Sequence, residues 1–72
     1  MKNIKKIKIK LNGKIIFVPE NSKILSIIND LKVPIKKVAI ELNQQIIDKK
    51  KISKINLKKN DKIEIVHFIG GG

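Results

Sequence analysis

The chain has 72 residues, enough for one domain with a single modest core and too few to enclose an enzyme pocket of several hundred cubic ångströms. It contains no cysteine and one histidine, which excludes a disulfide framework, thiolate metal sites and sites built from several histidines. Its net charge of +11 would suit a nucleic acid or an anionic surface, but every basic residue is lysine, and Tyr and Trp are absent. The chain therefore has few side chains that could form specific hydrogen bonds to bases or stack on them.

A β-hairpin is predicted at the start of the chain. Along residues 4–11, isoleucine and leucine alternate with lysine, a period of two that is typical of a half-buried strand. Asn12-Gly13 follows, the strongest short signal for a hairpin turn, because both residues accept a positive φ. Residues 14–18 form the returning strand, which Pro19 should end because proline has no N–H to donate.

One amphipathic helix is predicted after the hairpin. Asn21 or Ser22 can cap its N-terminus. The helix should end near residue 31, because Val33 precedes a proline and is thereby pushed toward extended geometry. Apolar residues at helical spacing form one stripe, made of Ile24, Ile27, Ile28 and Leu31.

The second half of the chain reads as further strands around a lysine-rich loop. Residues 37–42 alternate as a strand does, and an Asn-Gln-Gln turn leads into a very short return strand at Ile46-Ile47. Residues 48–60 are weakly patterned and form a loop with one helical turn. The apolar residues expected to anchor this loop are Ile52, Ile55 and Leu57. A turn at Asn60-Asp61 then leads into the last strand, residues 62–68.

This order of elements predicts an α+β fold in which one face of a sheet is covered by a single main helix. The composition of the last strand gives information about the other face of the sheet. Residues 65–69 are nearly all apolar. A central strand covered on both faces would have this composition. Alternatively, the strand offers Val66 and Phe68 to a partner from the uncovered face. We favour the second interpretation, since one helix leaves one face open.

Three glycines follow the last strand directly. Ordering glycine costs more conformational entropy than ordering any other residue and buries nothing, so a structural role is hard to find. Residues 69–72 can extend about 13 Å and, without Cβ atoms at the end, can enter a narrow channel. The α-carboxylate of Gly72 is ionised at neutral pH and can attack the α-phosphate of a nucleotide. The resulting acyl-adenylate accepts a thiol, an amine or sulfide, so the tail suits an acyl group that another protein activates.

The chain resembles the ThiS family, the sulfur carriers of thiamine biosynthesis, over essentially its whole length. "ELNQQII" looks like the family's turn between the third and fourth strands, and Asn60-Asp61 looks like its polar turn before the final strand. The ending "IVHFIGGG" is the most specific piece. The resemblance implies a ubiquitin-like β-grasp fold, with a mixed sheet of four or five strands packed against one main helix. In that fold the final strand lies at the centre of the sheet beside the first.

The resemblance also implies a function. An E1-like adenylyltransferase would use ATP and Mg²⁺ to adenylate the carboxylate of Gly72. Sulfur from a cysteine desulfurase system would replace AMP, and the thiocarboxylate would donate its sulfur to thiazole synthase. The chain would then be a carrier and not an enzyme, with no bound cofactor and no metal site. A strongly positive charge departs from the family pattern, and a basic docking face on the partner would repel it.

The expected organisation is a domain of residues 1–69 followed by a flexible tail of Gly70, Gly71 and Gly72. Partner-binding residues are expected at the end of the last strand, namely Val66, Phe68 and Ile69. His67 is interpreted as structural or interfacial, and the lysine runs 49–51 and 58–59 as a solvated face. No stretch is long and apolar enough to span a membrane, and the alternating lysines near the start do not resemble a signal peptide, so we expect a cytoplasmic protein.

Three alternatives stay open at this point. The small subunit of molybdopterin synthase has the same tail chemistry, and a ubiquitin-like modifier would form an isopeptide bond through Gly72. A small basic domain that binds nucleic acid would have an inert tail. Against the last, codons rich in A and T encode Lys, Ile and Asn, which are abundant here, so base composition can account for the charge.

Overall fold

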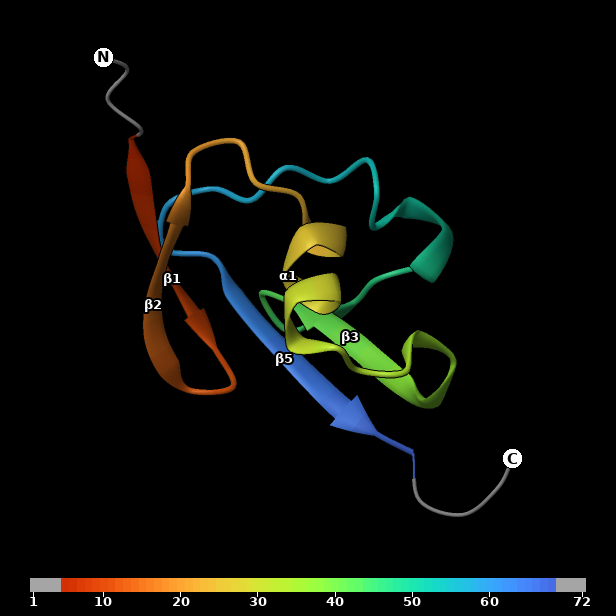
Figure 1. Ribbon diagram of the computed structural model, residues 1–72. Coiled ribbons are helices and arrows are strands. Elements are labelled where there is room, and N and C mark those ends of the chain that lie inside the picture. The colour runs from red at the N-terminus through yellow and green to blue at the C-terminus, as the bar shows by residue number, and fades with distance from the viewer. Residues whose placement is uncertain (1–4, 69–72) are drawn as a thin grey trace.

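The computed structural model describes residues 5–68, which form a five-stranded sheet with one α-helix packed on one face (Figure 1). In chain order the elements are β1 (Lys6–Leu11), β2 (Lys14–Pro19), α1 (Ile24–Leu31), the 3₁₀ helix η1 (Ile35–Lys37), β3 (Val38–Leu42), β4 (Gln45–Ile46), the 3₁₀ helix η2 (Lys49–Lys51) and β5 (Lys62–His67). No helix within this described range is long and apolar enough to cross a membrane.

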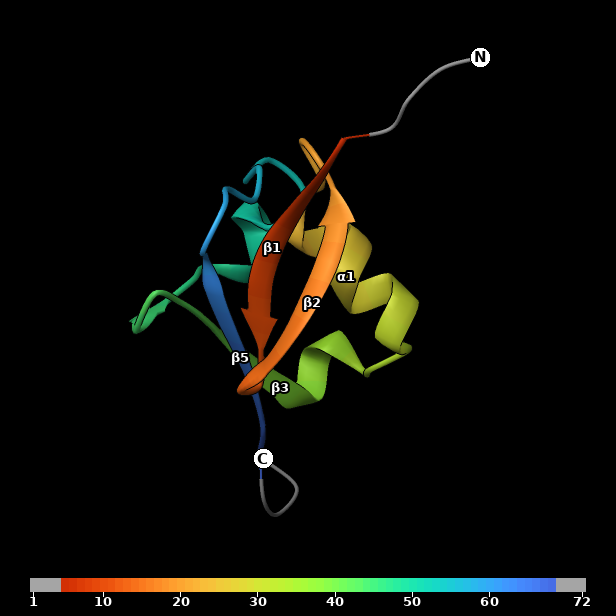
Figure 2. The same ribbon diagram turned by 90° about the vertical axis from the view of Figure 1, so that its left-hand side faces the viewer.

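The sheet is mixed, with the strand order β2-β1-β5-β3-β4. β1 pairs antiparallel with β2 and parallel with β5, while β5 pairs antiparallel with β3, and β3 with β4. Figure 2 shows β1 and β2 in the foreground with α1 behind them. The expected placement of the last strand at the centre of the sheet, beside the first, is therefore confirmed, as is the mixed sheet with one main helix.

The core lies between α1 and the sheet. Ile24, Ile27 and Ile28 of α1 are buried against a layer from the sheet that includes Ile9, Ile40 and Ile63. The loop anchors behave as predicted, since Ile52 and Leu57 are buried and Ile55 is half-buried against the same cluster. Leu31, the last residue of α1 and the fourth member of the predicted apolar stripe, is 42% exposed, while the other three are buried.

The N-terminus of α1 is not capped as the sequence suggested. The N-cap is Lys23, whose side chain makes no capping hydrogen bond. The first free N–H groups instead donate to backbone carbonyls of the loop after η2, Ile24 to Ile55 at 3.2 Å and Leu25 to Ile52 at 3.2 Å. The Ser22 hydroxyl donates to the carbonyl of Pro19 at 2.6 Å. Contacts distant in sequence thus replace the expected cap.

Several strand boundaries differ by one residue from the prediction. Pro19 is the last residue of β2, which is possible because β2 is an edge strand. β4 is Gln45–Ile46 and not Ile46-Ile47, because a two-residue turn at Asn43-Gln44, with φ of 52° and 70°, places Gln45 opposite Leu42. β3 begins at Val38 and β5 ends at His67. The 3₁₀ helix η1 was not predicted.

The hairpin turn also fastens β1 to the central strand. Asn12 has φ 50° and Gly13 φ 85°, both positive as the turn requires. The Asn12 backbone N–H donates to the carbonyl of Ile63 at 2.9 Å, and its side-chain Oδ1 accepts from the N–H of Ile65 at 2.8 Å. Asn12 thereby extends the parallel pairing between β1 and β5 beyond the ends of the ladder.

Replacing Asn12 by Ala should lower the free energy of unfolding by about 1–3 kcal/mol, because the Ile65 N–H loses its acceptor and alanine is strained at positive φ. Asn12→Gly is the matched control, since it removes the same side chain without that strain. Urea unfolding measures both variants. A stability of Asn12→Ala equal to that of the parent protein would contradict the fastening role of Asn12.

Candidate functional site

Two turns fix the start of the central strand β5. The Asn43 side chain accepts from the N–H of Lys62 at 2.9 Å and donates to Asp61 Oδ1 at 3.0 Å. Asp61 Oδ2 in turn accepts from the N–H of Lys58 at 2.7 Å. The "ELNQQII" turn and the Asn60-Asp61 turn, which carry part of the family resemblance, are therefore bonded to each other. Together they determine where β5 begins and thus the line along which the chain leaves the sheet.

The side chains of β5 alternate between the two faces of the sheet. Ile63 and Ile65 are buried on the face covered by α1. Lys62, Glu64 and Val66 point to the opposite face, which we call the open face. Successive strands place their exposed side chains on this same face, as the pairing registers require.

The C-terminal end of β5 carries an exposed apolar pair on the open face. Val66 is 50% and Phe68 57% exposed. Ala39, opposite Val66 on β3, adds a small side chain beside them. The Phe68 N–H donates to the carbonyl of Lys37 at 2.9 Å, which holds the chain in line with β3 one residue past the end of β5. The structure thus brings together, at the point where the chain leaves the sheet, the two predicted partner residues that it describes.

A lysine from η2 lies against this apolar pair. Lys49 Nζ is 5.2 Å from the centroid of the Phe68 ring, within the range of a cation–π interaction. The rest of the lysine runs behaves as the predicted solvated face, because Lys50 and Lys51 are exposed, as are residues 58–59. Lys49 is therefore the one residue of these runs with a described contact to a predicted site residue.

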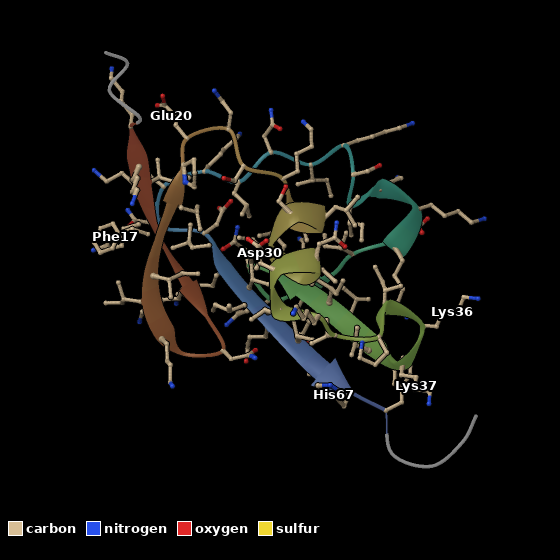
Figure 3. All side chains as sticks on the ribbon, in the orientation of Figure 1. Phe17, Glu20, Asp30, Lys36, Lys37 and His67 are labelled. Carbon is tan, nitrogen blue, oxygen red and sulfur yellow. The ribbon has the colours of Figure 1, made fainter. Side chains whose placement is uncertain are left out.

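The remaining site residues predicted from the sequence, Ile69, Gly70, Gly71 and Gly72, lie outside the described residues, as does the predicted domain boundary at residue 69. His67 is exposed at the end of β5, opposite Val38 of β3 (Figure 3). Among residues 5–68, no three His, Cys, Asp or Glu side chains are grouped so that they could hold a metal ion.

The open face carries more apolar surface than the sequence analysis assigned to it. Ile15 and Phe17 of β2 are 55% and 62% exposed, and Ile46 of β4 is 75% exposed. Figure 3 shows Phe17 on the side of the sheet away from α1. A signal for the β2 residues was present, because residues 15–18 are apolar without alternation. An edge strand with that composition must expose apolar side chains on one face.

The open face has the features of an interaction surface. Exposed apolar side chains rimmed by charged residues mark protein interaction sites.

Comparison with known proteins agrees with this geometry. The model of the ThiS family matches residues 3–72. The sulfur carrier protein ThiS of Bacillus subtilis (strain 168) is 35% identical over 65 residues, which cover 89% of this chain and 98% of that protein. A thiazole synthase of Paramagnetospirillum magneticum is 40% identical over 47 residues, 65% of this chain, and the chain spans only 14% of the length of that relative.

A solved structure has the same fold. The crystal structure of the thiamine biosynthesis protein ThiS from Geobacter metallireducens superimposes with a TM-score of 0.80 at 28% identity, covering 92% of this chain and all of that one. The fold is thus the ubiquitin-like β-grasp. The family match over nearly the whole chain and the similarity to the Bacillus carrier show that this chain belongs to the ThiS family of sulfur carrier proteins.

Proposed function

We propose that this chain carries sulfur as a thiocarboxylate on Gly72 for the synthesis of the thiazole part of thiamine. In this role the chain is not an enzyme but a co-substrate, and its partners supply the catalysis. It binds no cofactor of its own; ATP and Mg²⁺ belong to the reaction of the adenylating partner. Because the chemistry consumes ATP, we place it in the cytoplasm.

The carboxylate passes through two substitutions. In the first, an oxygen of the Gly72 carboxylate attacks the α-phosphorus of ATP and displaces pyrophosphate, which leaves an acyl-adenylate. In the second, hydrosulfide attacks the acyl carbon; where a cysteine desulfurase system supplies the sulfur as a persulfide, two thiols are oxidised to a disulfide to reduce that sulfur to hydrosulfide. AMP leaves, one proton is released and the C-terminal thiocarboxylate remains. An E1-like adenylyltransferase is the proposed catalyst of the first step.

The observation that carries this proposal is the way the chain leaves the fold. β5 is the central strand, and its last described residues run out beside β3 with Val66 and Phe68 exposed. The sequence then continues through Ile69 into three glycines, which have no side chain to obstruct a narrow active-site channel. A rigid body with an apolar docking surface thus precedes a segment that suits insertion into a partner.

Thiazole synthase is the proposed acceptor of the sulfur. A thiazole synthase contains a segment 40% identical to 47 residues of this chain. The presence of a carrier-like segment within that protein supports a functional link between a carrier of this family and thiazole formation. It distinguishes the proposed pathway from those of the molybdopterin synthase subunit and of a protein modifier.

A reconstituted reaction tests the function. The chain is incubated with its adenylyltransferase, ATP, Mg²⁺, sulfide and thiazole synthase with its small-molecule substrates, and thiazole phosphate is measured by chromatography. Product should form in proportion to the carrier added, and the same mixture without the carrier is the control. Equal product in both mixtures would contradict the proposed role.

Phe68 is proposed as a contact of the adenylyltransferase. Because Phe68 is 57% exposed and stands two residues before the first glycine of the tail in sequence, Phe68→Ala should raise the KM for the carrier in adenylation about tenfold while kcat and Tm stay close to the parent values. Leu31→Ala is the matched control, since Leu31 is also an exposed apolar residue but lies on α1. Steady-state kinetics at varied carrier concentration measures both. An equal KM for the two variants would remove Phe68 from the docking surface.

A further inference from the structure

The open face has a second region, built from β1, β2 and the start of β5, in which lysine and apolar side chains alternate. Lys8 and Lys10 of β1 lie opposite Phe17 and Ile15 of β2 in the antiparallel register. On the other side of β1, Lys10 lies opposite Lys62 in the parallel register. All three lysines are exposed. The register therefore gathers three positive charges around two exposed apolar side chains.

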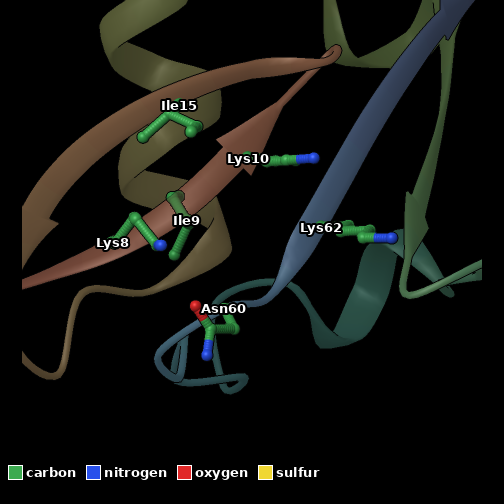
Figure 4. A pocket seen from close by; sticks show the side chains of 6 residues that line it. All are labelled: Lys8, Ile9, Lys10, Ile15, Asn60 and Lys62. Carbon is green, nitrogen blue, oxygen red and sulfur yellow. The ribbon is translucent and has the colours of Figure 1, made fainter.

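These lysines surround a hollow of about 130 Å³ (Figure 4). Its lining consists of Lys8, Ile9, Lys10, Ile15, Asn60 and Lys62. The Asn60 N–H donates to the carbonyl of Lys8 at 2.7 Å, so the turn that forms one wall is tied to β1. No acidic residue lines this hollow, and Glu64 lines an adjoining one together with Lys10 and Lys62. We call the lysines Lys8, Lys10 and Lys62, with Ile15 and Phe17, the basic region of the open face.

The charge and size of the basic region define the group that fits it. Three exposed lysines that line one hollow raise the local positive potential, which an anionic group would lower. The volume accommodates a carboxylate side chain. The apolar neighbours Ile15 and Phe17 suit a protein surface, since interfaces combine apolar anchors with charged groups at their rim. Phe17 is the one aromatic residue here, so a row of stacked bases would lack the platform that single-stranded nucleic acid uses.

The glycine tail makes recognition by the body of the domain necessary. Three glycines offer a partner only backbone atoms and a carboxylate, which many chain ends could offer equally. An enzyme that spends ATP on one particular C-terminus must therefore distinguish its substrate through the surface of the folded domain. Lys62 begins β5 and Phe68 follows its last residue, a separation of six residues or about 20 Å, so a single interface of standard size can cover both the basic region and the end of β5.

We propose that the basic region is a docking site for an acidic face of the adenylyltransferase, with carboxylate side chains of that enzyme seated on Lys8, Lys10 and Lys62. This inference rests on the proposed function, because it assigns the partner of the same carrier. A basic docking face on the partner would repel a carrier with a net charge of +11. In this proposal the partner's docking face is acidic where it meets this carrier, so that repulsion does not arise. Opposite charges then steer the encounter and fix its register.

Two variants of equal net charge test the proposal. The first replaces Lys8, Lys10 and Lys62 with Gln. The matched control replaces Lys50, Lys51 and Lys54 with Gln, which are exposed, belong to η2 or the turn after it, and do not line the hollow. Binding to the adenylyltransferase from the same organism is measured by titration calorimetry without ATP, so that docking is observed whether or not the chemistry proceeds. Circular dichroism confirms that both variants are folded.

The first variant should bind at least about tenfold more weakly than the parent at low salt and show a smaller loss of affinity as salt is raised, while the control stays within about threefold. In kinetic assays the same variant should raise the KM for the carrier and leave kcat near the parent value. Equal weakening in both variants would show an effect of overall charge and overturn the local site. Unchanged binding of the first variant would also overturn it.

Two further outcomes distinguish this proposal from nucleic-acid binding and from the proposed sulfur-carrier function. If the first variant instead loses affinity for a single-stranded oligothymidine of 20 nucleotides while its binding to the enzyme is unchanged, the region serves nucleic acid and the proposal is wrong. If the parent protein binds the enzyme through the basic region but never acquires sulfur, the proposed function fails and the docking site stands.

Discussion

Deleting Gly71 and Gly72 should abolish thiazole formation completely while leaving the fold intact. The physical reason is that the reacting carboxylate would move back by two residues, about 7 Å along an extended chain, and could no longer reach the reaction centre of a partner that holds the domain by its open face. The deleted residues follow the last described strand, so the core and its hydrogen bonds are unaffected. Product formation in the reconstituted system measures the effect.

A matched control tests whether the loss is specific to the tail. Replacing Lys50 and Lys51 with Gln alters two exposed residues of η2 and should leave thiazole formation near the parent level. Thermal unfolding of the deletion variant should give the parent Tm. Undiminished thiazole formation by the deletion variant, or a large fall in its Tm, would contradict the separation of a stable body from a reactive tail.

Ile63→Ala should be the most destabilising single truncation in the central strand. Ile63 is fully buried, pairs with Leu11 on one side and Leu42 on the other, and packs in the same core as α1. Truncation removes buried methyl groups and leaves a cavity, which costs about 2–5 kcal/mol. In a domain of this size that loss is comparable to a large part of the total stability, so a substantial unfolded population is expected at 37 °C.

Ile46→Ala provides the comparison for this variant. Ile46 is an isoleucine in the same sheet but is 75% exposed, so its truncation should change the free energy of unfolding by no more than about 0.5 kcal/mol. Urea unfolding followed by circular dichroism measures both. Similar losses of stability in the two variants would mean that the core does not lie between α1 and the sheet.

Local sequence patterns predicted most elements of this fold. The features that they failed to predict depend on contacts between segments distant in sequence. The alternation along β1 and the Asn12-Gly13 turn are local signals, and the hairpin formed as expected. The N-terminus of α1 was misassigned because its acceptors are carbonyls of Ile52 and Ile55, about thirty residues away in sequence. No local pattern reports such a bond. The central position of β5 likewise depends on pairing with both β1 and β3, and the family resemblance, not periodicity, predicted it.

The part of the candidate site that lies along a single strand was predictable from the sequence. The part that is assembled from several segments was not. Val66 and Phe68 stand in a single apolar run, and their exposure follows from one helix covering one face. The basic region combines β1, β2, β5 and the turn at Asn60, so it appears only when the register is known. The exposure of Ile15 and Phe17 was predictable from the sequence, because an apolar run in a strand with one covered face must expose some of its side chains.

The mass of the intact protein tests the central claim most directly. After incubation with the adenylyltransferase, ATP, Mg²⁺ and sulfide, the mass should rise by about 16 Da, the exchange of one oxygen for one sulfur at the acyl carbon, and fragmentation should place the increase on Gly72. A sample without ATP should keep the original mass. An unchanged mass in the complete mixture, or an increase placed on any other residue, would contradict the account.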